Sequence, residues 1–381
     1  MNSIKLGTIL HMEKGKKPKA QSSTQHDGYL PYVDIKAFEQ GIIDNYATTE
    51  RSLLCEEGDL LIVCDGSRSG LTGRAIKGVV GSTLSKIYAD GLTTEFLRYF
   101  IQSKYALLNT KKKGTGTPHL NAEILKQAEI VVPPLSEQER IVARIEELFS
   151  ELDEAVETLQ TTKQQLAVYR QAVYDSVYAA SSDLKPITDF FEITGGLTKN
   201  SKRNELPLKM PYLRVANVYY NRLDLSEIKE IGVTEAEVER CQLFKDDLLV
   251  VEGNGSKDQI GRVAIWDGSI DGCLHQNHII KGRPRGTMLS QYALFYLISG
   301  RGRKQITEIA KSTSGLYTLS TNKVKGLKIP YCDLLQQHRA VDEIQARLSV
   351  CDSIEKTVDT ALQQAEAMRQ SILKQAFEGR I

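Results

Sequence analysis

Two stretches rich in glycine, basic and small polar residues have the composition of loops that contact a polyanion. They span residues 65–74 (DGSRSGLTGR) and residues 253–262 (GNGSKDQIGR). Glycine lets backbone amides approach a phosphate, and arginine or lysine can neutralise the phosphate or bind guanine edges. The candidate contacts are Arg68, Ser69, Thr72 and Arg74 in the first stretch, and Asn254, Ser256, Lys257, Gln259 and Arg262 in the second. The alternative is a pair of ordinary strand-connecting turns with solvated charges.

A second pair of stretches combines lysine with small hydroxyl residues. Residues 111–120 read KKKGTGTPHL, and residues 311–319 read KSTSGLYTL. Lysines suit contact with a nucleic-acid backbone, while hydroxyl and imidazole groups can reach base edges. The candidates are Lys111, Lys112, Lys113, Thr115, Thr117, His119, Lys311, Ser312, Thr313 and Tyr317, with weaker basic clusters at Lys14, Lys16, Lys17, Lys19, Arg301, Arg303 and Lys304. A solvated face is the alternative for the lysine run.

Both pairs of stretches belong to a tandem repeat. GDLLIV at residues 58–63 recurs as DDLLVV at residues 246–251, and Gly73-Arg74 recurs as Gly261-Arg262, both shifted by 188 positions. At a shift of 199 positions, Leu135, Gln138, Arg140, Val142 and Ile145 match Leu334, Gln337, Arg339, Val341 and Ile344. A duplicated module has two equivalent binding surfaces, which suit a target with two separated parts.

No residue pattern supports catalysis or a metal site in this chain. A GxxxxGK[ST] phosphate loop is missing, and Pro133-Pro134 has neither the polar partner nor the aromatic ring of an amino-methyltransferase motif. Asp34 and Lys36 form half of a nuclease motif that the second copy does not repeat. Cys273, His275 and His278 supply only three candidate metal ligands, and the first copy lacks them. We therefore expect a binding protein without a metal.

A long helix is predicted after each globular segment. Residues 135–185 and residues 334–378 contain no glycine or proline, and Ser136 with Glu139 has the form of a capping box. Apolar residues recur in a stripe too narrow to stabilise an isolated helix, so we expect an antiparallel coiled coil. Its predicted contacts are Ile141, Ile145, Leu148, Leu152, Leu159, Leu166 and Val173, with Ile344, Leu348, Val358, Leu362, Met368 and Ile372. The alternative is two helices that each pack on their own domain.

The globular segments predict an α+β fold with more strand than helix. Short apolar runs ending in turn residues indicate buried strands at residues 58–66 and 246–254, preceded by strands near residues 31–35 and 211–215. Amphipathic helices are expected near residues 93–109 and 289–306. The predicted divisions are residues 1–133 and 185–332 for the globular domains, and residues 134–184 and 333–381 for the helices.

The net charge of +1 conceals an alternation along the chain. Residues 1–133 hold 17 Lys and Arg against 14 Asp and Glu, and residues 182–332 hold 22 against 17. The helical stretches are acidic, with 4 against 9 in residues 134–181 and 6 against 8 in residues 333–381. A polyanion would therefore prefer the globular segments. Six scattered cysteines without a CxxC pair, and no transmembrane or secretory segment, predict a reduced, cytoplasmic protein.

Three segments of the chain resemble a known family. VVPPLSEQERIVARIEELFSELD at residues 131–153, KGLKIPYCDLLQQHRAVDEI at residues 325–344 and MRQSILKQAFEGR at residues 368–380 are similar to the specificity subunits of type I restriction-modification systems. The resemblance covers essentially the whole chain. The second junction departs from the pattern, because Pro330-Tyr331-Cys332 stands where the first junction has consecutive prolines.

The resemblance implies a non-catalytic subunit that reads a bipartite, asymmetric sequence in double-stranded DNA. Each globular segment would be a target-recognition domain, and the paired helices would act as a ruler. Two modification subunits would methylate adenine N6 with S-adenosylmethionine, and restriction subunits that use ATP and Mg²⁺ would be further partners. No cofactor is expected in this chain. The alternatives are a DNA reader of another methylation-based defence system and a coiled-coil scaffold with two protein-binding heads.

Overall fold

The structure is a computed structural model that describes residues 3–110, 118–179, 181–254, 256, 259–313 and 316–381. It divides into two compact units, one made of residues 1–160 with residues 359–381 and the other of residues 161–358. Each unit combines one α+β domain with part of both long helices, as the sequence predicts for the fold class. The predicted four-part division differs from these units because each domain packs against helical segments from two places in the chain. No helix in the described ranges has the length and apolarity to span a membrane.

The first domain is built on an antiparallel sheet with the strand order β2-β10-β7-β8. These strands are β2 (Leu10–Lys14), β10 (Leu84–Ala89), β7 (Leu60–Val63) and β8 (Thr72–Arg74). A second sheet has the order β3-β5-β4-β9-β6, with β3 (Gln21–Ser22), β5 (Tyr46–Thr48), β4 (Tyr29–Val33), β9 (Gly78–Val80) and β6 (Leu54–Cys55). The remaining elements are β1 (Ser3–Lys5), β11 (Glu129–Val131), α1 (Ile35–Gln40), α2 (Thr94–Ser103), α3 (Tyr105–Thr110) and α4 (Ala122–Gln127).

The second domain repeats the first sheet in the order β13-β22-β18-β20. Its strands are β13 (Phe191–Gly195), β22 (Ile279–Pro284), β18 (Leu248–Val251) and β20 (Val263–Ile265). Other strands are β12 (Leu184–Pro186), β14 (Lys209–Leu213), β15 (Val218–Tyr219), β16 (Arg222–Leu223), β17 (Lys229–Gly232), β19 (Gly253–Asn254), β21 (Leu274–His275), β23 (Lys311–Thr313), β24 (Leu316–Thr318) and β25 (Lys328–Pro330). The short helices are α6 (Glu235–Cys241), α7 (Ser290–Ile298), α8 (Gly300–Ile309) and α9 (Thr321–Lys325).

The central strands β7 and β18 explain the repeated apolar run. Successive side chains of a strand point to opposite faces of its sheet. Leu60 and Ile62 enter one hydrophobic core, while Leu61 and Val63 enter another. Leu248 with Val250 and Leu249 with Val251 divide between two cores in the same way. Both faces of each strand are therefore buried, so the run is continuously apolar instead of alternating.

The long helices α5 (Leu135–Tyr178) and α10 (Leu334–Phe377) pair antiparallel in each unit, which confirms the predicted coiled coil. Each has 44 residues, or roughly 66 Å of helix. In the first unit, Ile141 shares a core with Leu373, and Arg369 forms an ion pair with Asp153. In the second unit, Arg170 pairs with Asp352 at 2.6 Å and with Glu355 at 2.8 Å.

The predicted stripe is largely on the inner face of the helices. Ile141, Ile145, Leu166, Val173, Ile344, Leu348 and Val358 are buried, and Leu148, Leu152, Leu159, Leu362 and Ile372 are half-buried. Met368 was predicted wrongly, because it is 54% exposed, and near the same helix end Leu373 is fully buried while the predicted neighbour Ile372 is only half-buried. A straight helix drifts by about 20° per heptad, which moves the buried position by one residue near the end of a long stripe.

Two boundaries also differ from the predictions. The prediction that Ser136 and Glu139 form a capping box is wrong. Helix α5 begins at Leu135, and the backbone amides of Glu137 and Gln138 donate to the carbonyl of Pro134. Ser136 therefore lies inside the first turn. The first helix ends at Tyr178 and not at residue 184, because β12 pairs with β25 from Leu184 onward.

The last residue of each long helix packs against an aromatic pair on a domain. Phe377 lies edge-on to Phe96 and Phe100 of α2, with ring centroids at 5.1 and 5.3 Å. Tyr178 lies edge-on to Tyr292 and Tyr296 of α7, with centroids at 5.1 and 5.4 Å. Edge-on aromatic pairs add about 0.5–1.5 kcal/mol to the energy of burial.

A buried glutamine fixes the first turn of each long helix against its domain. Gln138 accepts a hydrogen bond from the amide of Thr93 at 2.8 Å and donates to the carbonyls of Gly91 and Pro133. Gln337 accepts from the amide of Leu289 at 2.8 Å and donates to the carbonyls of Thr287 and Cys332. Both side chains are fully buried, so the match at a shift of 199 positions reflects a repeated polar anchor.

We predict that Gln337→Leu lowers the free energy of unfolding of the second unit by about 1–3 kcal/mol, because buried backbone groups lose their partners. The measurement is urea unfolding followed by the fluorescence of Trp266, the one tryptophan of the chain, which is buried in the second domain. Gln336→Leu is the matched control, since that neighbouring side chain is exposed. Equal effects of the two substitutions would contradict the anchor.

Candidate nucleic-acid interface

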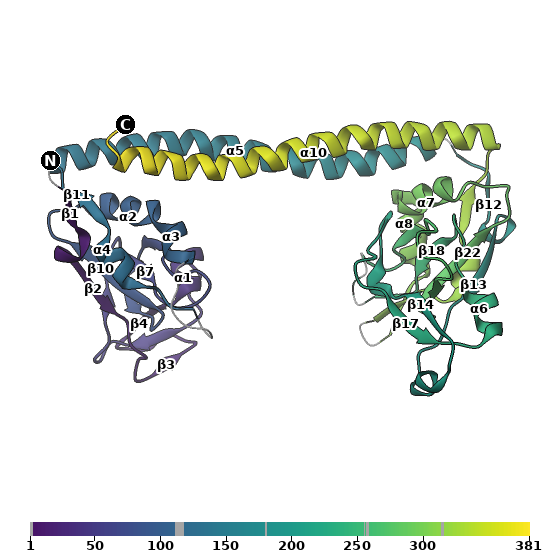
Figure 1. Cartoon of the computed structure of the whole chain (residues 1–381), viewed down its shortest axis with the longest axis horizontal. Helices are drawn as coiled ribbons and strands as arrows, with labels where there is room; N and C mark the ends of the chain where they lie inside the picture. The colour runs from purple at the N-terminus through teal and green to yellow at the C-terminus, as the bar shows by residue number, and fades with distance from the viewer. Residues whose placement is uncertain (1–2, 111–117, 180, 255, 257–258, 314–315) are drawn as a thin grey trace. The chain divides into compact units, whose positions relative to one another are not determined.

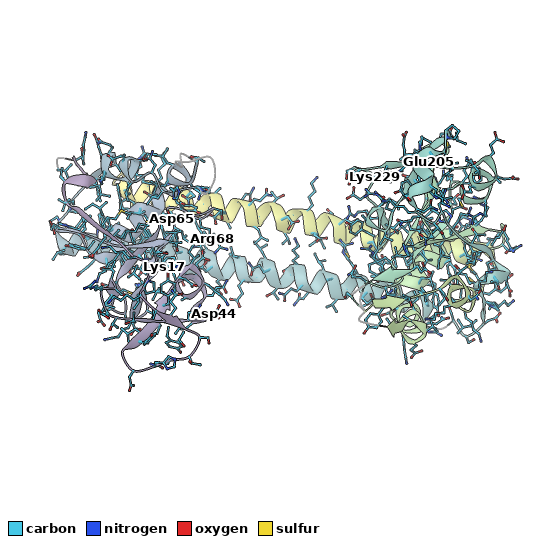
Figure 2. All side chains as sticks on the ribbon, turned by 90° about the horizontal axis from the view of Figure 1, so that it is seen from below. Lys17, Asp44, Asp65, Arg68, Glu205 and Lys229 are labelled. Atoms are coloured by element: carbon cyan, nitrogen blue, oxygen red, sulfur yellow. The ribbon has the colours of Figure 1, made fainter. Side chains whose placement is uncertain are left out.

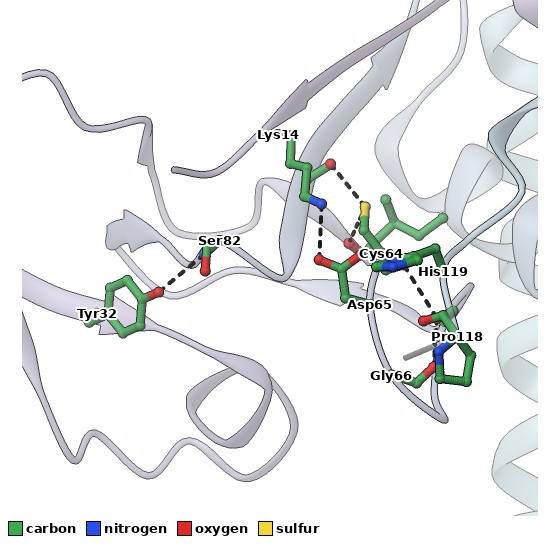
Figure 3. A network of polar contacts seen from close by, with 11 residues as sticks. Lys14, Tyr32, Cys64, Asp65, Gly66, Ser82, Pro118 and His119 are labelled. Carbon is green, nitrogen blue, oxygen red and sulfur yellow. Dashed lines mark hydrogen bonds and ion pairs between the residues drawn. The ribbon is translucent and has the colours of Figure 1, made fainter. Parts of the chain in front are cut away.

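In the first domain, the two candidate stretches lie side by side, as Figure 3 shows. The amide of Leu120 donates to the carbonyl of Cys64 at 2.7 Å, and the amide of Gly66 donates to the carbonyl of Pro118 at 2.8 Å. The loop after β7 and the segment before α4 therefore form one surface, although about 50 residues separate them in the chain. The surface begins where the buried central strand ends, so a rigid sheet holds it.

Asp65 joins the two loops through its side chain. Its carboxylate accepts from Lys14 Nζ at 2.9 Å and contacts His119 Nδ1 at 2.7 Å (Figure 3). Partial burial raises the pKa of Asp65, but hydrogen bonds from His119 and Lys14 outweigh it and leave the pKa below its ordinary value. The three side chains line an open pocket of about 560 Å³ together with Cys64 and Lys126. Fixed charges of both signs thus meet at the junction of the loops.

The second domain brings its own candidate stretches together in the same way. β19 pairs with β24, so that Gly253 faces Thr318 and Asn254 faces Tyr317. The amide of Leu319 donates to the carbonyl of Glu252 at 2.7 Å, which is the counterpart of the bond between Leu120 and Cys64. The repeat therefore preserves the junction of the loops as well as the sheet beneath it.

Two predicted contacts, Ser69 and Thr72, are wrong because their side chains are 0% and 5% exposed. Ser69 Oγ donates to the carbonyl of Gly66 at 2.7 Å and so closes the turn. Gly70, which follows, has a φ of 97°, a value that favours glycine. These small residues shape the loop and do not reach its surface.

The arginines of the first loop are exposed but paired with carboxylates. Arg68, which projects from the same loop as Asp65 (Figure 2), forms an ion pair with Glu39. Arg74 Nε lies 2.6 Å from Glu95 Oε1, and this contact raises the pKa of Arg74. Burial raises the pKa of Glu95, but its hydrogen bonds to Arg74 and Arg98 produce a net decrease. Each arginine would have to exchange its carboxylate for a phosphate in order to bind one.

Arg262, the counterpart of Arg74, has a different environment. Its Nη2 donates to the carbonyl of Val215 at 3.0 Å, and its guanidinium carbon lies 5.1 Å from the ring centroid of Tyr219. Tyr317 is half-buried on β24, and Gln259 donates its amide to the carbonyl of Ser256. The tyrosine at residue 219 was missed from the sequence because nothing in the repeat marks its segment.

The remaining candidates fall outside the description of the structure. Lys111, Lys112, Lys113, Thr115, Thr117 and Lys257 lie outside the described residues, and so do the side chains of Asn254, Lys311, Ser312 and Thr313. Their assignment to nucleic-acid contact stays a prediction. Among the described residues, Asp65, Glu39 and Glu95 were not recognised as neighbours of the loops, because their contacts depend on tertiary packing.

The histidine and cysteine group near β21 has a structural explanation. Burial raises the pKa of the Cys273 thiol to about 12. His275 is fully buried, its Nδ1 contacts the carbonyl of Ile279 at 2.8 Å, and burial lowers its pKa to about 3. His278 instead contacts Glu252 at 3.1 Å. In the part of the chain that the structure describes, no three His, Cys, Asp or Glu side chains are grouped to hold a metal ion.

Comparison with known proteins identifies this arrangement with one family. The family model for the type I restriction modification DNA specificity domain matches residues 1–166 and 182–364. The chain is 23% identical to the type I restriction enzyme MjaVIII specificity subunit of Methanocaldococcus jannaschii, covering 99% of this chain and 92% of that protein. It is 22% identical to the EcoKI specificity subunit of Escherichia coli strain K12, covering 99% and 88%.

Solved structures support the same fold. A chain from a study of complex assembly and conformational transition of the type I R-M system aligns with a TM-score of 0.74 at 16% identity, covering 100% of this chain and 98% of that one. The HsdS subunit from Thermoanaerobacter tengcongensis aligns with a TM-score of 0.55 at 16% identity, covering 100% and 97%.

We predict that Asp65→Asn loosens the junction of the loops. Because the pKa of Asp65 is lowered, its ionic contacts stabilise the fold above the ordinary aspartate pKa and are lost as the pH falls through the lowered value. Near pH 7 the substitution should speed hydrogen exchange at the amides of Gly66 and Leu120 by about two- to fivefold, as expected for an ion pair worth up to about 1 kcal/mol.

Asp90→Asn is the matched control for this measurement. Asp90 pairs with His11 at 2.9 Å on an exposed part of the same domain. Its loss should leave the exchange of Gly66 and Leu120 unchanged. Unchanged exchange in Asp65→Asn as well would show that the backbone bonds hold the loops without the carboxylate.

Proposed function

Because the chain belongs to the type I restriction-modification specificity family, we propose that its two domains each read one half of a split, asymmetric sequence in double-stranded DNA. One observation carries the proposal. In both domains the same pair of loops is joined beyond the central strand, by the bond from Leu120 to Cys64 and by its counterpart from Leu319 to Glu252. Two surfaces with one scaffold but different side chains suit two different half-sequences.

The proposal assigns the chemistry to partner subunits. The chain would position two modification subunits that methylate adenine N6 with S-adenosylmethionine, and restriction subunits that need ATP and Mg²⁺. Leu135 and Leu334, which match at a shift of 199 positions, are 58% and 44% exposed at the first residue of their helices. An exposed leucine at the same place in both copies offers two equivalent contacts for two copies of one partner.

The long helices would set the spacing between the half-sequences. Two readers on one face of B-DNA are about one helical turn apart, roughly 34–36 Å. α5 and α10 run for 44 residues each without glycine or proline, so neither contains a residue that favours a bend. A pair of rigid helices fixes the distance between two readers, whereas a flexible linker would allow that distance to vary.

The test of the proposed function is a methylome. The chain is co-expressed with a modification subunit of the same system, and N6-methyladenine is mapped by long-read sequencing. We expect a split, asymmetric motif that is methylated only when this chain is present. A stable complex with an active modification subunit that adds no methylation would refute the proposal and favour the scaffold function.

The ruler is tested by adding one heptad to each helix, after Gln160 in α5 and after Val358 in α10. These positions are the boundaries of the two units. Seven residues add about 10 Å and nearly preserve the helical face. We expect the methylated motif to keep both half-sequences while its spacer lengthens by about three base pairs, or methylation to be lost. A motif with unchanged spacing would refute the ruler.

A further inference from the structure

The second domain carries a tyrosine and arginine cluster around the turn between β15 and β16. The guanidinium carbon of Arg222 lies 4.5 Å from the ring centroid of Tyr219, and that of Arg262 lies 5.1 Å from the same centroid. Arg303 lies 5.1 Å from the ring centroid of Tyr220. Arginine stacks well on aromatic rings, because its charge is delocalised over a planar group.

Backbone contacts fix the cluster beside the candidate loop. β15 pairs with β16 so that Tyr219 faces Arg222, and the turn residue Asn221 donates its amide to the carbonyl of Val263 at 2.9 Å. Arg303 Nη1 donates to the carbonyl of Ile260 at 2.7 Å. The turn, the loop before β20 and helix α8 are thereby held together at one place on the domain.

Two arginines of this cluster are available to an anion, in contrast to Arg68 and Arg74 in the loop of the first domain. Among the described residues, Arg222 and Arg262 form no ion pair, whereas Arg74 is bound to Glu95. Arg222 is exposed. The nearby carboxylate of Asp224 is held by the hydroxyl of Ser226 at 2.6 Å and by the amide of the same residue at 3.1 Å. An aromatic ring supports a guanidinium without cancelling its charge, so the group can still bind an anion.

We propose that Tyr219, Arg222 and Arg262 form a binding site for the phosphodiester backbone of DNA, and that this site contributes more salt-sensitive affinity than Arg74, its paired counterpart in the first domain. The inference rests on the proposed function and adds an asymmetry to it. Arginine offers several N–H donors in a plane that matches a phosphate group. We favour DNA over an acidic protein surface as the ligand because the cluster adjoins the candidate DNA-binding loop. It contacts Ile260 and Val263 at the end of that loop, whose beginning pairs with residues 317–319 of the second candidate stretch.

The experiment measures DNA affinity of the assembled complex between 50 and 200 mM salt, on a duplex with the methylated motif and on a scrambled duplex. Each lost phosphate contact reduces the slope of log K against log salt by about one. We expect Arg222→Ala to reduce the slope by about one and to weaken both duplexes alike, while Arg222→Lys retains most of the slope. Arg74→Ala in the first domain should change it by less than half as much.

Arg285→Ala is the matched control, because Arg285 is an exposed arginine of the same domain that lies outside the cluster. It should leave the slope nearly unchanged. A wild-type slope in both Arg222→Ala and Arg262→Ala, with normal binding by the parent complex, would overturn this site and leave the proposed function intact. If these variants instead lose a modification subunit at an unaltered slope, the cluster is a protein contact. A parent complex without DNA affinity would refute the proposed function together with this site.

Discussion

Neither long helix can bury its apolar stripe alone, and this constraint organises the whole chain. Antiparallel pairing buries the apolar stripe of each helix against the other helix. It also brings the start of one helix next to the end of the other within each unit. The buried amides of Gln138 and Gln337 then fix each helix start, while Phe377 and Tyr178 fix each helix end. Each domain is therefore held by two helical segments from different parts of the sequence, and its core includes side chains from both.

The two copies of the repeat are similar in their buried strands and differ in the side chains of their surface loops. A strand buried on both faces accepts only apolar side chains of suitable size, which keeps GDLLIV and DDLLVV similar. The loops beyond these strands need only their backbone bonds to each other. Arg74 and Arg262 show the resulting freedom, since the same residue type meets a carboxylate in one copy and an aromatic ring in the other. One architecture can thus present two electrostatically different surfaces.

Local patterns made the helices, the central strands and the repeat predictable from the sequence. The period becomes less accurate along a long helix, however, because a small mismatch accumulates with each heptad, and this explains why Leu373 is buried more fully than the predicted Ile372. The candidate loops were identified by composition, but their junction depends on contacts such as that between Cys64 and Leu120, which no local signal reveals. Composition also cannot distinguish a side chain that shapes a turn, such as Ser69, from one that reaches its surface.

The core of the first domain includes Leu373 and Ala376, which lie within the last ten residues of the chain. During translation these side chains are made after the whole of the second domain, so the first domain completes its core only after the second domain has been synthesised. The second domain receives Val173, Tyr174 and Tyr178 from a helix that has already emerged. Folding on the ribosome should therefore run against the order of synthesis, with the N-terminal domain finished only after the second domain and both long helices have been made.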